Sequence, residues 1–225
     1  MAAPSDLPSD PMPDLPAKPA ERVKEPMFNA PWPAVAIAGV ILLSYGVQSQ
    51  ASDQGLGLAL FPDRVMAGQP AGLLTSLFLH GGWPHAVMNA AFALAFGAPV
   101  ARLFGLGPKG AAGFLVFYLL CGVLAGLAFV GLHPQGNEPV VGASGAVAGL
   151  MGAAARLMDR RGELGSPFSR SALSMAAAWV IVNALVAYTG LTPGGDGGAI
   201  AWEAHLGGFA AGLLLVGPFH RLLGR

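Results

Sequence analysis

The stretch "EPVVGASGAVAGLMGAAAR", residues 138–156, consists almost entirely of apolar and small residues and is long enough to enter a lipid bilayer. A single hydroxyl group, that of Ser144, lies within it between Gly142 and Gly145. Polar groups inside membrane spans are energetically costly, which makes them candidate functional groups. Taken alone, however, a serine in such a helix more often bonds to its own backbone or allows close helix packing.

The composition of the 225-residue chain predicts an integral membrane protein with several spans. Hydrophobic residues make up 54% of the sequence and charged residues 11%, and the mean hydropathy is +0.58. A soluble domain carries about 25% charged residues, so this chain has too few charges to solvate a globule of its size. The formal net charge of zero offers no basic surface for nucleic acid. Cys121 is the only cysteine, which excludes an internal disulfide.

The N-terminal segment differs in composition from the rest of the chain. Nine of the 19 prolines lie within residues 1–33, together with acidic and basic residues in mixed order. Such a composition cannot bury a core. We therefore expect residues 1–31 to form a disordered, Pro-rich cytoplasmic tail, and residues 32–220 to form the membrane domain.

Six segments are apolar enough to form membrane-spanning helices of roughly 20 residues, so the predicted fold is an all-α polytopic bundle. These segments are residues 32–49, 84–104, 111–132, 139–157, 172–190 and 199–219. With a cytoplasmic tail, eleven of the twelve Lys and Arg residues fall on the cytoplasmic side, and only Arg64 falls outside. Basic residues concentrate on the cytoplasmic side of membrane proteins. Both termini are therefore predicted to be cytoplasmic, in a chain that suits a bacterial inner membrane.

Polar residues of the second, fourth and sixth predicted spans lie at a similar depth. Asn89 follows Pro84 by five residues, Ser144 lies five residues into its span, and His205 lies six residues into its own. At about 1.5 Å per residue, all three lie roughly 7–9 Å below the outer ends of their helices. His85 lies one turn above Asn89 on the same helix face.

A hydroxyl beside an imidazole is the smallest unit of nucleophilic catalysis, because the imidazole accepts the hydroxyl proton and returns it to the leaving group. Donors from His85 and Asn89 can stabilise the oxyanion that forms. Glu203 precedes His205 by two residues and points to another side of the helix, so we expect a dyad without a carboxylate. His80 and His85 have poor spacing for zinc, and the sequence has no HExxH motif. We therefore expect neither a metal nor a cofactor.

These residues resemble the motifs of rhomboid intramembrane serine proteases. The matching motifs are "HGGWPHAVMN" at 80–89, "GASG" at 142–145 and "AHLGGFAAG" at 204–212. In order and spacing they cover the chain from about residue 70 to 215. The resemblance implies a six-helix bundle with Ser144 as nucleophile and His205 as general base. It also implies an oxyanion site made by His85, Asn89 and the Ser144 N–H, and substrates that are membrane proteins cut in or near a transmembrane segment.

Two positions depart from the rhomboid pattern. Many rhomboids carry a Trp-Arg pair in the first outer loop, where this sequence has Ala71 and Gly72, so other contacts must brace that loop. The position four residues after the serine is often an aromatic residue that packs against the histidine, and here it is Ala148. Both residues of the dyad are retained, which favours an active enzyme.

Small residues are predicted to set the distance between the fourth and sixth spans. His205, Gly208 and Gly212 form one stripe, and a stripe of Ser144, Ala148 and Gly152 is expected to face it. Gly142 and Gly145 flank the serine and belong to the same set of spacing residues. With the stripes in contact, the serine oxygen should lie roughly 2.6–3.2 Å from an imidazole nitrogen.

Two functions other than proteolysis remain open. The first is that of an inactive rhomboid-like protein that binds transmembrane clients, with which the changes at Ala71 and Gly72 are compatible. The second is that of a transporter, for which Glu203 is the only buried charge available. Asn183 is expected to form a packing hydrogen bond, and the stretch "TGLTPGGDGG" at 189–198 suggests a hinge beside a lateral entrance.

Overall fold

The structure is a computed structural model that describes residues 29–159, 163–190 and 200–223. Within these residues every regular element is helical. Six long helices are present: α1 (Trp32–Gln48), α4 (Trp83–Phe104), α5 (Pro108–Leu132), α6 (Ser144–Ala155), α7 (Arg170–Thr189) and α8 (Trp202–Leu222). The connection from α1 to α4 contains four short helices: η1 (Leu56–Leu58), α2 (Pro62–Met66), α3 (Gly72–Thr75) and η2 (Ser76–Phe78). The predicted all-α bundle of six helices is confirmed.

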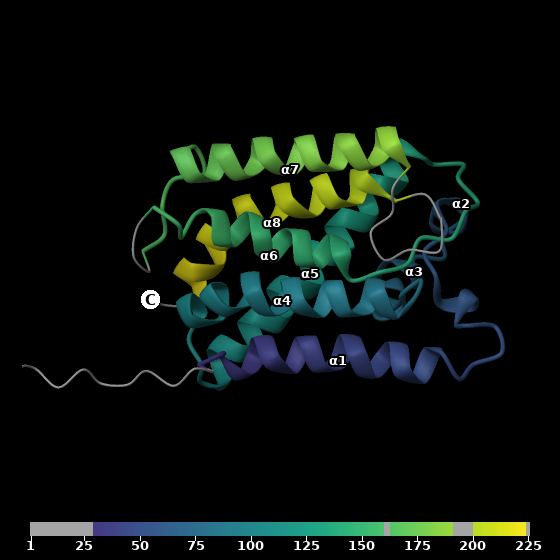
Figure 1. The fold of residues 1–225 in the computed structure, drawn as a ribbon, viewed down its shortest axis with the longest axis horizontal. Helices are drawn as coiled ribbons and strands as arrows, with labels where there is room; N and C mark the ends of the chain where they lie inside the picture. Colours follow the sequence, from purple (N-terminus) through teal and green to yellow (C-terminus); the bar gives the residue numbers. More distant parts are fainter. Residues whose placement is uncertain (1–28, 160–162, 191–199, 224–225) are drawn as a thin grey trace, which may run out of the picture.

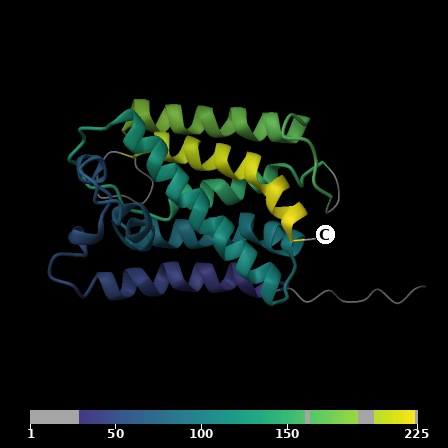
Figure 2. The same cartoon turned by 180° about the vertical axis from the view of Figure 1, so that it is seen from behind.

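The long helices run roughly parallel to one axis. In Figure 1, α1 and α4 lie side by side along one edge, α7 forms the opposite edge, and α6 and α8 lie between them. The reverse view shows α5 crossing obliquely in front of the other helices (Figure 2), on the face of the bundle that is turned away in Figure 1. As a result, α6 is enclosed by α4, α5, α7 and α8, all of which contact it.

Helix α6 is the centre of the bundle. Every residue from Gly145 to Ala155 is buried. An apolar helix without a polar face is suited to full enclosure by protein, and the small side chains of α6 let four neighbouring helices approach it. At 12 residues, α6 is about 18 Å long and shorter than the hydrocarbon core.

The helices α4, α5 and α7 are each long and apolar enough to cross a membrane, while α1 and α6 are shorter apolar helices. The chain is therefore a multi-pass membrane protein. Five of the six helices begin and end within three residues of the predicted spans. Helices α1, α4 and α5 each have a proline in the first turn. Proline is favoured there because it lacks a backbone N–H, and the first N–H groups of a helix have no acceptor within the helix.

The predicted start of the fourth span at residue 139 is wrong. Helix α6 begins at Ser144, because residues just before it pair with the α1–α4 connection instead. Val140 and Leu60 exchange two backbone hydrogen bonds in an isolated antiparallel bridge, and the Gly142 N–H donates to the Ser76 carbonyl at 3.0 Å. Ser144, the candidate nucleophile, is consequently the first residue of a helix. The residues before it reach this position as non-helical chain and not as the first turns of the helix.

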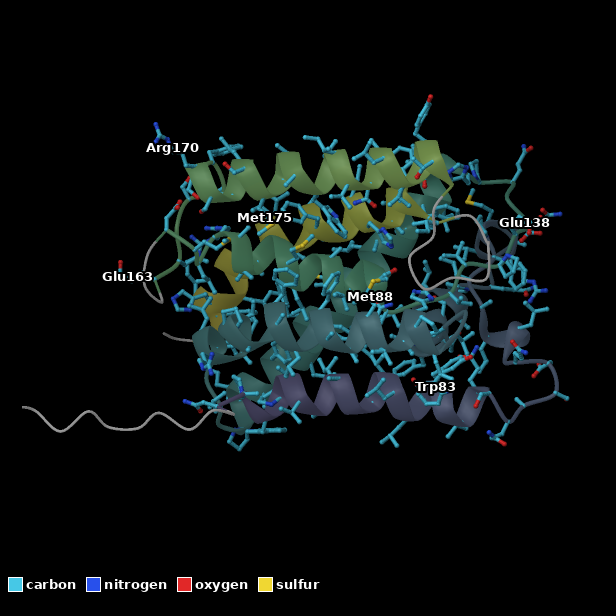
Figure 3. The ribbon with its side chains drawn as sticks, viewed as in Figure 1. Trp83, Met88, Glu138, Glu163, Arg170 and Met175 are labelled. Carbon is cyan, nitrogen blue, oxygen red and sulfur yellow. The ribbon has the colours of Figure 1, made fainter. Side chains whose placement is uncertain are left out.

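The two described ends of the chain lie at the same end of the bundle. The Trp32 indole N–H donates to the Leu106 carbonyl at 2.9 Å, and the Lys109 ammonium donates to the Leu223 carbonyl at 3.3 Å. Arg170 lies at this end, whereas Glu138 lies at the opposite end (Figure 3). The predicted tail falls almost wholly outside the described residues, as does most of the predicted hinge at 189–198.

The backbones of α6 and α8 approach very closely through glycine. A Cβ atom at Gly208 would collide with the Gly145 carbonyl, and one at Gly212 would collide with the Gly149 carbonyl. Gly145, Gly208 and Gly212 therefore lie at the helix contact, as expected. Gly152 of the predicted partner stripe also lies at this contact, because a Cβ there would collide with the Phe209 carbonyl of α8. Gly149, which the stripe did not include, lies there as well, and Ala148 belongs to a buried cluster with Phe209 of α8 and Trp179 of α7.

We expect Gly212→Val to destabilise the protein strongly, because the added atoms would overlap the backbone of α6. Overpacking of this kind costs about 1–3 kcal/mol or more. Gly39→Val is the matched control, since a Cβ at Gly39 in α1 meets nothing within 4 Å. Thermal unfolding in detergent measures both variants. Equal unfolding midpoints for the two variants would contradict the close approach of α6 and α8.

Candidate active site

The structure brings Ser144 and His205 into direct contact. The Ser144 Oγ lies 2.8 Å from the His205 Nε2. Ser144 is supplied by the first turn of α6 and His205 by the first turn of α8, and both side chains are half-buried. The distance falls inside the range expected from the sequence.

The position of Ser144 at the start of α6 also makes its backbone available. The first N–H groups of an α-helix have no acceptor within the helix, and the residue before Ser144 is Ala143, whose side chain cannot cap them. These N–H groups carry the positive end of the helix dipole. The Ser144 hydroxyl and its own N–H therefore lie together at a site that favours negative charge.

The hydrogen bonds around His85 determine which of its nitrogens carries a proton. The Gly81 N–H donates to the His85 Nδ1 at 3.2 Å. Because Nδ1 accepts, the neutral ring carries its proton on Nε2. A Cβ atom at Gly142 would lie 3.0 Å from this Nε2 and 3.5 Å from the Ser144 Oγ. The space beside Gly142 is thus bordered by a donor and by the candidate nucleophile.

Gly142 does not act as a helix spacer, which corrects the expectation from the sequence. Gly142 lies in the non-helical chain before α6. Its backbone has a φ of +129°, a value that residues other than glycine rarely adopt. Because Gly142 has no side chain, there is space beside the His85 ring. The glycine does not set the distance between two helices.

Asn89 is buried one turn below His85 and is 4% exposed. Its Nδ2 donates to the His85 carbonyl at 3.0 Å. A primary amide has two N–H donors, so this bond leaves one N–H for another acceptor. Asn89, His85, Ser144 and His205 all line one cavity of about 440 Å³. Three of the long helices therefore direct polar groups into one cavity.

A model of the Rhomboid domain matches residues 67–222, which is more than half of the chain. The chain belongs to the rhomboid family. RHOMBOID-like protein 9, chloroplastic, of Arabidopsis thaliana is 36% identical over 91 residues, which are 40% of this chain and 19% of that protein. This rhomboid thus matches less than a fifth of the length of that relative.

The connection from α1 to α4 of this rhomboid is braced without a Trp-Arg pair. The Thr75 hydroxyl lies 2.6 Å from the Leu58 carbonyl and 3.1 Å from the Ala71 carbonyl, both of which accept from it. A Cβ at Gly72 would lie only 2.9 Å from the Leu60 Cα. The loop packs so tightly here that position 72 has no space for a side chain. Backbone packing and the Leu60–Val140 bridge hold the loop in place.

Gln48 fixes the segment before α4, a role that the sequence did not indicate. Its Nε2 donates to the His80 carbonyl at 2.9 Å, and its Oε1 accepts from the His80 N–H at 2.8 Å. This amide clamp fastens the chain beside Gly81, whose N–H orients His85. The His80 ring is buried against His85, and burial, followed by the charge of His85, lowers the pKa of His80 to about 3. His80 is therefore neutral at pH 7.

Trp179 of α7 lies against the His205 ring. The two ring centroids are 5.9 Å apart and the rings are tilted by 39°. The aromatic neighbour of the histidine thus comes from another helix. The Glu203 Oε1 lies 2.9 Å from the His133 Nε2. The His205 Nδ1 instead lies 2.9 Å from the Asn183 Oδ1, a pairing that sequence spacing could not reveal.

We expect Gly142→Ala to reduce the reactivity of Ser144, because the new Cβ would press on the His85 ring. Gly68→Ala is the matched control, since Gly68 also has a positive φ of +83° but open space around it. Both variants carry the backbone strain, and only one intrudes on the site. Labelling of Ser144 by a fluorophosphonate, at equal folded fraction, compares them. Equal labelling rates would mean that Gly142 has no role at the site.

Proposed function

We propose that this protein is an intramembrane serine endopeptidase that uses a Ser144–His205 dyad to cleave transmembrane segments of other membrane proteins. The observation that carries the proposal is the 2.8 Å contact between the Ser144 Oγ and the His205 Nε2 at the wall of a cavity. Membership of the rhomboid family supports the same chemistry. The proposal requires neither a metal nor a cofactor.

The reaction begins when the Ser144 oxygen attacks the scissile carbonyl carbon and its proton passes to the His205 Nε2. The tetrahedral intermediate collapses when the imidazolium returns this proton to the amine leaving group. A water molecule, with His205 again accepting a proton, then hydrolyses the acyl ester of Ser144. The cavity around the dyad provides the space that this water needs inside an otherwise apolar bundle.

Three donors stabilise the negative oxygen of the intermediate. They are the Nε2–H of His85, the second amide N–H of Asn89 and the backbone N–H of Ser144. Donors that are fixed before the reaction stabilise charge without having to reorient. The amide clamp of Gln48 on His80 and the bond from Gly81 to His85 support this arrangement.

A transmembrane substrate enters from the lipid beside α7. Met88 and Phe92 of α4 and Trp179 of α7 line the cavity, and α7 is the long helix with the fewest buried residues. A helical substrate hides its carbonyls in its own hydrogen bonds. Segments with small or helix-weakening residues are therefore the preferred substrates, because they unwind more readily.

The protein lies in a bacterial inner membrane with both termini in the cytoplasm. Arg102, Lys109, Arg170 and Arg221 lie in the last or first turns of helices at the end of the bundle that holds both described chain ends. Basic residues favour the cytoplasmic side. The site lies toward the other end, so cleavage takes place near the outer face.

Fluorophosphonate labelling of the purified protein tests the nucleophile. We expect labelling of the wild type and none of Ser144→Ala, because the probe forms a covalent bond with an activated serine. Ser174→Ala, an exposed serine on α7, is the control and should label like the wild type. Labelling that persists in Ser144→Ala would refute the assignment. A wild type that never labels but still binds transmembrane segments would favour an inactive client-binding protein.

Alanine variants test the oxyanion donors. We expect His85→Ala and Asn89→Ala each to slow cleavage of a reporter transmembrane substrate by about 10²–10³-fold, the usual effect of losing one such donor. Thermal unfolding serves as the control for loss of fold. If both variants cleave at the wild-type rate, their hydrogen bonds serve only the fold.

A further inference from the structure

The outermost helix of the bundle buries one polar side chain, and that side chain contacts the base. Of the 20 residues of α7, only Ala172 and Asn183 are buried. Asn183 is 3% exposed, and its Oδ1 lies 2.9 Å from the His205 Nδ1. A buried amide in a helix that otherwise faces outward is costly unless its hydrogen bonds are satisfied.

The second hydrogen bond of Asn183 fixes the direction of the first. Its Nδ2 donates to the Trp179 carbonyl at 2.8 Å. A carbonyl can only accept, so the amide nitrogen must face it and the amide oxygen must face His205. This oxygen can likewise only accept, and therefore the His205 Nδ1 carries the proton. The Nε2 of the neutral ring is then left with a lone pair that points at the Ser144 hydroxyl.

We propose that Asn183 is a positioning residue that holds His205 in the tautomer and orientation required of a general base. This inference rests on the proposed protease function. In a Ser-His-Asp triad a carboxylate performs this task, whereas here a neutral amide does so. The amide avoids the cost of a buried negative charge, because it donates to Trp179 and accepts from His205 at the same time.

Trp179 completes the arrangement from the same helix. Its ring packs against the imidazole of His205, while its carbonyl fixes the Asn183 amide. Glu203 and His85 are the nearby titratable groups. Glu203 is paired with His133, and His85 bonds to the Gly81 N–H through its Nδ1. Among the described residues, Asn183 alone has a hydrogen bond to the His205 Nδ1.

The rate of fluorophosphonate labelling of Ser144 tests the proposal on the full chain in detergent. We expect Asn183→Leu to label about 10²-fold more slowly than the wild type, the cost typical of a misplaced catalytic group. Asn183→Asp keeps an acceptor oxygen at this position and should recover much of the rate. Ser174→Leu places the same side chain at an exposed position of α7 and should label normally.

Nuclear magnetic resonance of ¹⁵N-labelled histidine gives a readout that a purely structural role would not change. The His205 signals, assigned by their loss in His205→Gln, should show Nδ1–H in the wild type and a mixture of tautomers in Asn183→Leu. A wild-type His205 protonated on Nε2 would overturn the proposal even if no variant folds. Labelling of Asn183→Leu at the wild-type rate would also overturn it.

Different results would refute the protease function and the positioning role of Asn183. If labelling of the wild type does not depend on Ser144, the protease function fails, and the positioning role fails with it. If labelling depends on Ser144 and Asn183→Leu reacts at the wild-type rate, only the role of Asn183 is refuted.

Discussion

The contact between the backbones of α6 and α8 determines where Ser144 and His205 lie. Glycine at Gly152, Gly208 and Gly212 removes the side chains that would otherwise collide with the backbone of the facing helix. Lipid offers little hydrophobic drive for helix association, so close van der Waals packing has to supply it. The close packing that stabilises α6 against α8 also places the first turn of α8 beside the first residue of α6. His205 therefore lies next to Ser144.

The site itself is assembled from groups whose proton positions are set by the backbone. The Gly81 N–H sets the tautomer of His85, and the Trp179 carbonyl sets the orientation of Asn183, which in turn sets that of His205. Each of these steps uses a group that can only donate or only accept. In a low-dielectric bundle, such fixed dipoles have a stronger effect than they would in water. The arrangement also requires no buried carboxylate.

Much of the fold and half of the site could be predicted from the sequence. Apolar length gave five of the six helices to within three residues, and common depth brought together Ser144, His205, His85 and Asn89. The start of α6 was missed, because Val140 pairs with Leu60, some 80 residues earlier in the chain. Gly142 was misplaced for the same reason. Hydropathy and spacing are local, whereas such pairings depend on distant parts of the chain.

The sequence by itself determined that the chain crosses a membrane several times and which residue types are available for chemistry. Composition and periodicity are sufficient for this, because transfer into lipid is a property of each segment alone. The tertiary structure decided which groups meet. From the sequence, Asn183 is a packing residue and position 148 lacks an aromatic side chain. In the structure α7 lies beside α8, so Asn183 contacts the His205 Nδ1 and Trp179 supplies an aromatic ring next to His205. Hydrogen-bond partners from different helices follow from packing geometry, which no single segment encodes.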